Sequence, residues 1–176
     1  MPFQRKIKIA LTGGIGTGKT YISKQFLDIG IPIFYADDET KKLYDSPKVQ
    51  ALLKTHFQDK FFTDNKLDRC KIADFIFLNN ENKKQFEAII HPLVMQQFEE
   101  WAAQQTSPIV MLESAIIFEA KLTHYFDKIF VVDAPLSVRV KRLKDRLLEI
   151  EIRQRILSQM PQEEKCKRAD LVIWNG

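Results

Sequence analysis

The eight residues from Gly13 to Thr20 read Gly-Gly-Ile-Gly-Thr-Gly-Lys-Thr, and they constrain this chain more than any other segment. They match the pattern Gly-x-x-x-x-Gly-Lys-Thr, in which small residues let consecutive backbone N–H groups turn inward around phosphate oxygens. Lys19 would reach the β- and γ-phosphates, and the Thr20 hydroxyl would take a coordination position on Mg²⁺. The segment therefore predicts a loop that binds a nucleotide, rather than a glycine-rich turn that binds nothing.

The residues on either side of this loop predict a strand before it and a helix after it. Residues 7–11 form a short apolar run, and residues 19–29 carry apolar side chains at helical spacing. Gly30 stands where a glycine commonly ends a helix. The phosphates would then lie at the positive end of that helix. We expect the nucleotide contacts to come from Gly13, Gly14, Ile15, Gly16, Thr17, Gly18, Lys19, Thr20 and Tyr21.

Four more apolar segments, each bounded by turn residues, predict further strands. They are residues 31–36, 109–112, 128–133 and 170–174. Their apolar runs lack a clean alternation with polar residues, which is typical of strands buried on both faces of a parallel sheet. Helices would serve as the crossovers. The sequence therefore predicts an α/β chain with the three-layer P-loop NTPase fold, built on a five-stranded parallel sheet.

The interval between the second and third predicted strands is much longer than one crossover needs. Residues 37–105 read as helices, over 48–57, 68–78 and 81–105. In small kinases a helical insertion at this position holds the phosphoryl acceptor. The alternative is that these helices only cover the sheet.

A basic segment near the C-terminal end predicts a lid. On a helix, Arg139, Arg142 and Arg146 would share one face and could converge on transferring phosphates. A mobile lid of this kind stabilises the charge of the transition state and excludes water. The alternative for each arginine is a solvated surface position. We thus expect a nucleotide-binding core made of residues 1–36, 106–136 and 161–176, a helical acceptor domain over residues 37–105, and a lid over residues 137–160.

Carboxylates at the ends of two predicted strands are candidates for catalysis. Asp37 follows the second strand, at the edge where ligands of open α/β sheets bind, and could accept the proton of an attacking hydroxyl. Asp37 or the adjacent Asp38 could also cap a helix over residues 39–44. Glu113 closes the third strand and could hold Mg²⁺ through a bound water, or could be a structural acid.

Two residues of the helical insertion are candidates for the acceptor side. Asp68 has the place of a helix cap, and Arg69 after it either binds an anion or is solvated. Pro92 interrupts the hydrogen bonding of the longest predicted helix and is expected to kink it. The kink could present His91 to a groove, although a structural kink with a satisfied histidine explains the pair equally well.

Composition excludes several other classes of protein. The formal net charge of +4 suits a protein that holds phosphate groups, and without a run of five like charges it does not indicate nucleic acid. We find neither the apolar core of a signal peptide nor a stretch long enough for a membrane span, so we expect no membrane association. Cys70 and Cys166 lack paired or metal-binding spacing, so we expect reduced thiols in a cytoplasmic protein.

Taken together, the residues resemble the dephospho-CoA kinase family over essentially the whole chain. The phosphate-binding loop alone is unspecific, but several short motifs match in order. They are Ala36-Asp37, Leu67-Asp68-Arg69, Ile90-His91-Pro92-Leu93-Val94, Ile117-Phe118-Glu119, the spaced Arg142 and Arg146, Gln159, Lys165, Ala169-Asp170 and Asn175-Gly176. The chain departs from the family pattern at Tyr35, which replaces the first aspartate after the second strand, and at Glu113-Ser114-Ala115, which stands where aspartate-valine-proline is common.

The resemblance implies transfer of the ATP γ-phosphate to the ribose 3′-hydroxyl of dephospho-CoA, with ATP and Mg²⁺ bound. It implies that Asp37 is the general base, that Arg146 with Arg142 acts from the lid, and that Arg69 and His91 bind the acceptor. We expect a monomer or weak homo-oligomer. The alternatives are another small-molecule or nucleoside monophosphate kinase and a nucleotide-dependent switch protein, although no Asn-Lys-x-Asp motif for guanine follows the fourth predicted strand.

Overall fold

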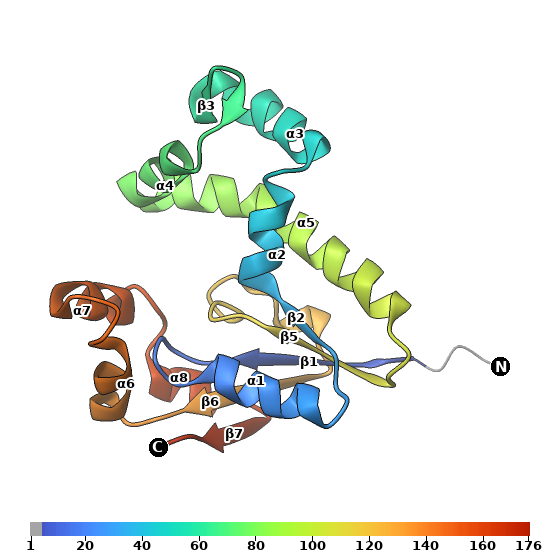
Figure 1. Cartoon of the computed structure of the whole chain (residues 1–176), viewed down its shortest axis with the longest axis vertical. Coiled ribbons are helices and arrows are strands. Elements are labelled where there is room, and N and C mark those ends of the chain that lie inside the picture. The colour runs from blue at the N-terminus through green and yellow to red at the C-terminus, as the bar shows by residue number, and fades with distance from the viewer. Residues whose placement is uncertain (1–4) are drawn as a thin grey trace. The chain divides into compact units, whose positions relative to one another are not determined.

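A central parallel sheet organises the chain in the computed structural model, which describes residues 5–176 (Figure 1). Its strand order is β2-β5-β1-β6-β7. The strands are β1 (Ile7–Thr12), β2 (Ile33–Tyr35), β5 (Ile109–Glu113), β6 (Lys128–Asp133) and β7 (Leu171–Trp174). All pairings are parallel, which confirms the predicted α/β fold and its five-stranded sheet.

The apolar runs of the central strands are buried, as their composition predicts. Leu11 on β1 and Met111 on β5 have no exposed surface, and Val132 on β6 has none either. They form one cluster with Ile9 and with Ile22 of α1 (Lys19–Asp28). Burial on this scale is what stabilises a sheet whose strands are separated by long connections.

The chain divides into two compact units, which we describe separately. One unit combines the chain up to Tyr35 with Trp101–Gly176 and contains the parallel sheet. The other is Ala36–Glu100 and is mainly helical. Besides α1, the sheet unit contains η2 (Thr123–Tyr125), α6 (Leu136–Leu143), α7 (Glu149–Leu157) and α8 (Gln162–Lys167).

Helix α1 ends as its sequence predicts. Gly30 has a φ of +87°, and its N–H donates to the carbonyl of Leu27 at 2.9 Å. The N–H of Ile31 donates to the carbonyl of Phe26 at 3.0 Å. These two bonds make a Schellman motif, in which a left-handed glycine satisfies carbonyls that the helix end leaves unpaired.

The helical unit is built around a cluster of phenylalanine rings. The centroids of Phe57 and Phe61 lie 4.8 Å apart, and Phe75 and Phe86 lie 5.1 and 5.8 Å from Phe61. Such tilted and edge-on pairs stabilise a small core beyond the area that they bury. The elements of this unit are α2 (Ala36–Leu43), α3 (Pro47–Phe57), η1 (Gln58–Phe61), β3 (Phe62–Thr63), β4 (Lys66–Leu67), α4 (Arg69–Leu78) and α5 (Asn80–Gln104), which ends beyond it.

Several sequence predictions for this unit are confirmed. Asp68 caps α4, because its Oδ1 accepts from the N–H of Cys70 at 2.9 Å. The long helix α5 continues through Pro92.

A short antiparallel hairpin of β3 and β4 was not predicted, because two-residue strands carry no periodic signal. Its turn residues Asp64 and Asn65 have φ values of +49° and +61°, as a tight hairpin turn requires.

Two sequence interpretations are wrong in detail. Helix α2 begins at Ala36, so Asp37 and Asp38 lie inside its first turn and do not cap a helix over residues 39–44. Carboxylates in a first turn still interact favourably with the helix dipole. Helix α6 ends at Leu143 and Arg146 lies in the turn after it, so Arg139, Arg142 and Arg146 do not share one helix face.

The cysteines and helix lengths bear on two further expectations. Cys70 and Cys166 are both free thiols, as predicted. Across residues 5–176, none of the helices combines the length and the apolar character that a membrane crossing requires.

We predict that Gly30→Ala lowers the free energy of unfolding by about 1–2 kcal/mol, because an L-residue in the left-handed region is strained. The added Cβ would meet no atom within 4 Å, so the loss is one of backbone conformation alone. Urea unfolding would measure it. Gly30→Asn is the matched control and loses less, since asparagine tolerates this region better; equal stabilities of all three proteins would contradict the assignment.

Candidate active site

The phosphate-binding loop lies between β1 and the start of α1, as predicted. Gly18 is the N-cap of α1, with a φ of +89°, and no side chain caps the helix. The first N–H groups of a helix have no partner within it. The helix dipole favours negative charge at this end, where an anion can take the place of a side-chain cap.

Arg139 packs against the glycines of the loop. A Cβ on Gly14 would lie 2.6 Å from an Arg139 guanidinium nitrogen, and one on Gly16 would lie 2.8 Å from the Arg139 carbonyl oxygen. A glycine, which has no Cβ, allows the loop to approach Arg139 this closely. The Nε of Arg139 donates to the carbonyl of Ile15 at 2.9 Å. Burial lowers the pKa of this guanidinium, while Asp133 opposes the shift. Arg139 therefore supports the loop from within the protein.

Arg142 contacts the loop from α6. Its guanidinium donates to the carbonyls of Gly16 at 3.4 Å and Thr17 at 3.3 Å, and to the carbonyl of Asn175 at 2.9 Å. The Asn175 side chain in turn donates to the Thr17 carbonyl at 2.8 Å. The contacts seen here bind Arg142 to backbone carbonyls of the loop and of the segment after β7.

Lys19 bridges the loop. Its Nζ donates to the Gly13 carbonyl at 2.9 Å and approaches the Gly14 carbonyl at 3.5 Å. The Thr17 hydroxyl donates to the same Gly14 carbonyl at 2.9 Å. The ammonium group is thus held inside the curve of the loop, where a lysine can exchange carbonyl contacts for phosphate oxygens.

Thr20 and Glu113 lie side by side, although 93 residues separate them. The Thr20 hydroxyl donates to Oε2 of Glu113 at 3.3 Å. Strand register explains this proximity, because Glu113 pairs with Leu11, two residues before the loop. A hydroxyl and a carboxylate are the hard oxygen ligands that Mg²⁺ prefers, completed by phosphate and water. The described residues contain no cluster of three or more His, Cys, Asp or Glu side chains that could hold a metal without a nucleotide.

Tyr35, which departs from the family pattern noted in the sequence, makes a structural contact at the end of β2. Its hydroxyl accepts a hydrogen bond from the Ser23 hydroxyl of α1 at 3.3 Å. Tyr35 pairs with Glu113 across β2 and β5. The substitution therefore ties the end of β2 to α1.

The helical unit carries three of the predicted site residues, Asp37, Arg69 and His91. Asp37 is exposed in the first turn of α2. Arg69 donates to the carbonyl of Lys41 in α2 at 3.2 Å and pairs with Asp45, in the turn after α2, at 2.9 Å. Arg69 is therefore bound to neighbouring residues and is only half exposed, at 51% of its side chain.

His91 and Arg146 have contrasting surroundings. His91 is half-buried on α5, and burial lowers the pKa of its imidazole; Glu87 raises that pKa and Lys83 lowers it. The neutral form of His91 is therefore favoured. Arg146 is exposed in the turn after α6, so its guanidinium is accessible to a ligand from solvent.

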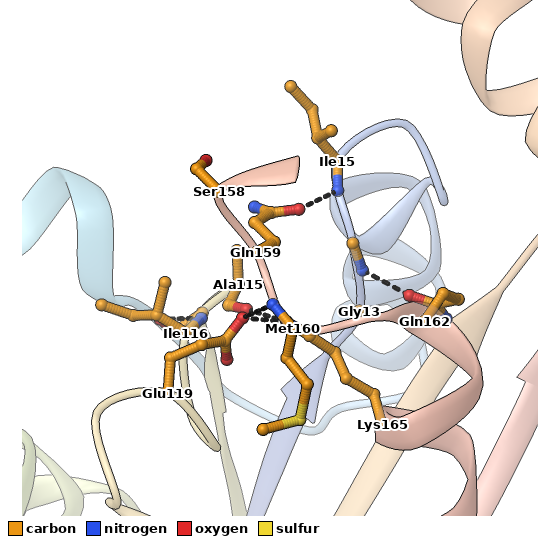
Figure 2. Close-up of polar contacts among 12 residues, drawn as sticks. Gly13, Ile15, Ala115, Ile116, Glu119, Ser158, Gln159, Met160, Gln162 and Lys165 are labelled. Atoms are coloured by element: carbon orange, nitrogen blue, oxygen red, sulfur yellow. Dashed lines mark hydrogen bonds and ion pairs between the residues drawn. The ribbon is translucent and has the colours of Figure 1, made fainter. Parts of the chain in front are cut away.

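Two glutamines that were not predicted as site residues contact the loop. The Oε1 of Gln162 accepts from the N–H of Gly14 at 2.7 Å, and the Oε1 of Gln159 accepts from the N–H of Ile15 at 2.8 Å (Figure 2). Gln159 is one of the residues that match the family pattern. No periodicity or charge pattern links either glutamine to a loop more than 140 residues away.

Comparisons with known proteins agree with this geometry. A shikimate kinase from Acinetobacter baumannii, solved in complex with shikimate, is 13% identical and covers 99% of this chain and 86% of its own, with a TM-score of 0.56. At this identity the similarity concerns the fold alone, and it supports the P-loop kinase fold. TT1252 from Thermus thermophilus is 32% identical with a TM-score of 0.87, over 98% of this chain and 90% of that protein.

Sequence relatives define the family. A dephospho-CoA kinase of Bacteroides fragilis (strain YCH46) is 37% identical over 173 residues, which cover 96% of this chain and 84% of the relative. The family model described as dephospho-CoA kinase matches residues 7–176. The resemblance seen in the sequence is confirmed, and the chain belongs to the dephospho-CoA kinase family.

Proposed function

We propose that this chain transfers the γ-phosphoryl group of ATP to the 3′-hydroxyl of dephospho-CoA, giving CoA and ADP. The bond between the γ-phosphorus and the β–γ bridging oxygen breaks, and a bond from the 3′-oxygen to that phosphorus forms. The hydroxyl proton passes to a carboxylate of the enzyme. The observation that carries the proposal is the uncapped start of α1 beside Lys19, in a member of this family.

The donor end of the reaction lies at the loop from Gly13 to Tyr21. The amides at the start of α1 bind phosphate oxygens, and Lys19 exchanges its carbonyl contacts for the β- and γ-phosphates. Thr20 and Glu113 would hold Mg²⁺, Glu113 directly or through water. When bound, this ion neutralises charge on the phosphates.

Asp37 is the proposed general base. Its carboxylate is exposed and follows the carboxyl end of β2 by two residues, and ligands of open α/β sheets bind outside these strand ends. A base here accepts the hydroxyl proton as the 3′-oxygen attacks, so its contribution falls mainly in the transition state.

Arginines supply positive charge in this proposal. Arg146, exposed in the segment 137–160, approaches the transferring group as a lid residue and excludes water with that segment. Arg142 acts with it, mainly by keeping the loop carbonyls in place. Domain 37–105 binds the acceptor, with Arg69 contacting a phosphate and His91 donating a hydrogen bond from its neutral ring.

Three further features belong to the same proposal. The enzyme acts in the cytoplasm, as a monomer or weak homo-oligomer, and without nucleic acid or membrane partners. The free thiols and mild net charge of +4 support this setting.

The acceptor is the first point to test. We expect ATP-dependent conversion of dephospho-CoA to CoA, with one ADP formed per CoA, and much slower turnover with nucleoside monophosphates. Coupled ADP release and chromatography of the acceptor measure both. A preference for a nucleoside monophosphate would identify a different kinase, and GTP turnover without any acceptor would favour a switch protein.

Asp37→Asn should lower kcat by about 10²–10⁴-fold, because the attacking hydroxyl loses its proton acceptor. The ATP KM should change little, since the base acts in the transition state. Asp38→Asn is the matched control: Asp38 is the adjacent exposed carboxylate, paired with Lys41 at 2.8 Å, and we expect near wild-type kcat. Wild-type turnover of Asp37→Asn would remove this residue from the mechanism.

Lys19→Ala should lower kcat/KM for ATP by about 10²–10³-fold, because the β- and γ-phosphates lose their cation. Steady-state kinetics at varied ATP would measure it, with a thermal unfolding curve as evidence that the fold is intact. Lys19→Arg keeps the charge and should retain more activity than alanine does. An undiminished rate in the alanine variant would contradict the loop assignment.

A further inference from the structure

We propose that Gln159 and Gln162 are positioning residues, which set the shape of the phosphate-binding loop by accepting hydrogen bonds from its Ile15 and Gly14 amides. The inference rests on the proposed function only in that the loop binds ATP. Both side chains come from one short segment that precedes and begins α8, and both reach the loop (Figure 2).

The orientation of the Gln162 amide group is fixed by a second contact. Its Nε2 donates to the Val132 carbonyl near the end of β6 at 2.9 Å, so its Oε1 faces the Gly14 N–H at 2.7 Å. A planar amide with both ends bonded cannot turn without losing both bonds. Gln162 therefore joins the loop to the sheet.

Ile15 is held from two sides. Gln159 accepts from its N–H at 2.8 Å, and the buried Arg139 donates to its carbonyl at 2.9 Å. With Gly14 bonded to Gln162 as well, successive amides of the loop are bound to neutral side-chain oxygens. The first half of the loop is thereby held in one shape, which reduces the ordering that a nucleotide must impose.

A buried ion pair anchors the segment that carries the glutamines. Lys165 of α8 has no exposed surface, and its Nζ contacts Oε1 of Glu119 at 2.7 Å and the Ala115 carbonyl at 2.6 Å. The same Glu119 oxygen accepts from the N–H of Met160, between the two glutamines, at 2.9 Å. A buried charge needs such partners, so these contacts bind the segment to the chain after β5.

The opposite reading is that the glutamine oxygens occupy amides that ATP phosphates need. The two readings predict opposite signs. Positioning residues strengthen nucleotide binding, so their loss weakens it. Glutamine oxygens that occupy phosphate-binding amides compete with the nucleotide, so their loss tightens nucleotide binding.

The test measures ADP and ATP-analogue binding by calorimetry in Gln159→Leu and Gln162→Leu, without acceptor. We expect Kd for ADP to rise about tenfold in each, the usual effect of losing one well-placed hydrogen bond. The KM for dephospho-CoA should stay near its wild-type value. Gln104→Leu, an exposed glutamine at the end of α5, is the control for the substitution itself.

Unchanged or tighter ADP binding in both leucine variants would overturn the proposal. A second measurement needs no variant: amide hydrogen exchange of Gly14 and Ile15 in the wild-type protein without nucleotide. We expect protection of both amides, and exchange as fast as in an unfolded peptide would also overturn it. Because these readouts need no acceptor, a wrong acceptor assignment would appear separately, as absent turnover of dephospho-CoA with intact ADP binding.

Discussion

The parallel pairing of β1 between β5 and β6 is the constraint on which the donor site depends. Its register sets Leu11 opposite Glu113 and Thr12 opposite Val131. The loop that follows β1 therefore emerges between the ends of two other strands. All three strands are apolar and largely buried, so the packing of their side chains in the core stabilises this pairing.

The loop itself is stabilised largely by residues distant in the sequence. Arg139 and Arg142 bind its carbonyls, and two glutamines bind its amides. Arginines of a basic segment are commonly assigned to the phosphates themselves. Here Arg139 and Arg142 support the backbone of the loop, while Arg146 lies in the exposed turn beyond α6.

The helical unit is stabilised by aromatic packing. It has few residues and obtains its core from a compact group of phenylalanine rings, while Asp37 and Arg69 stay at its surface. Arg69 is already oriented by Asp45 and the Lys41 carbonyl. A side chain held in this way loses less entropy when it binds an anion, which fits the acceptor role that we propose for it.

Sequence alone determined the strand–loop–helix unit, the five strands, the cap at Asp68 and the end of α1 at Gly30. These are local properties, set by apolar periodicity and by the conformations open to each residue. Only the tertiary structure decided that Thr20 meets Glu113, that Arg146 lies beyond α6, and that glutamines near α8 bind the loop. Such contacts join segments far apart in the chain, and their geometry follows from strand register and packing, which no local pattern encodes.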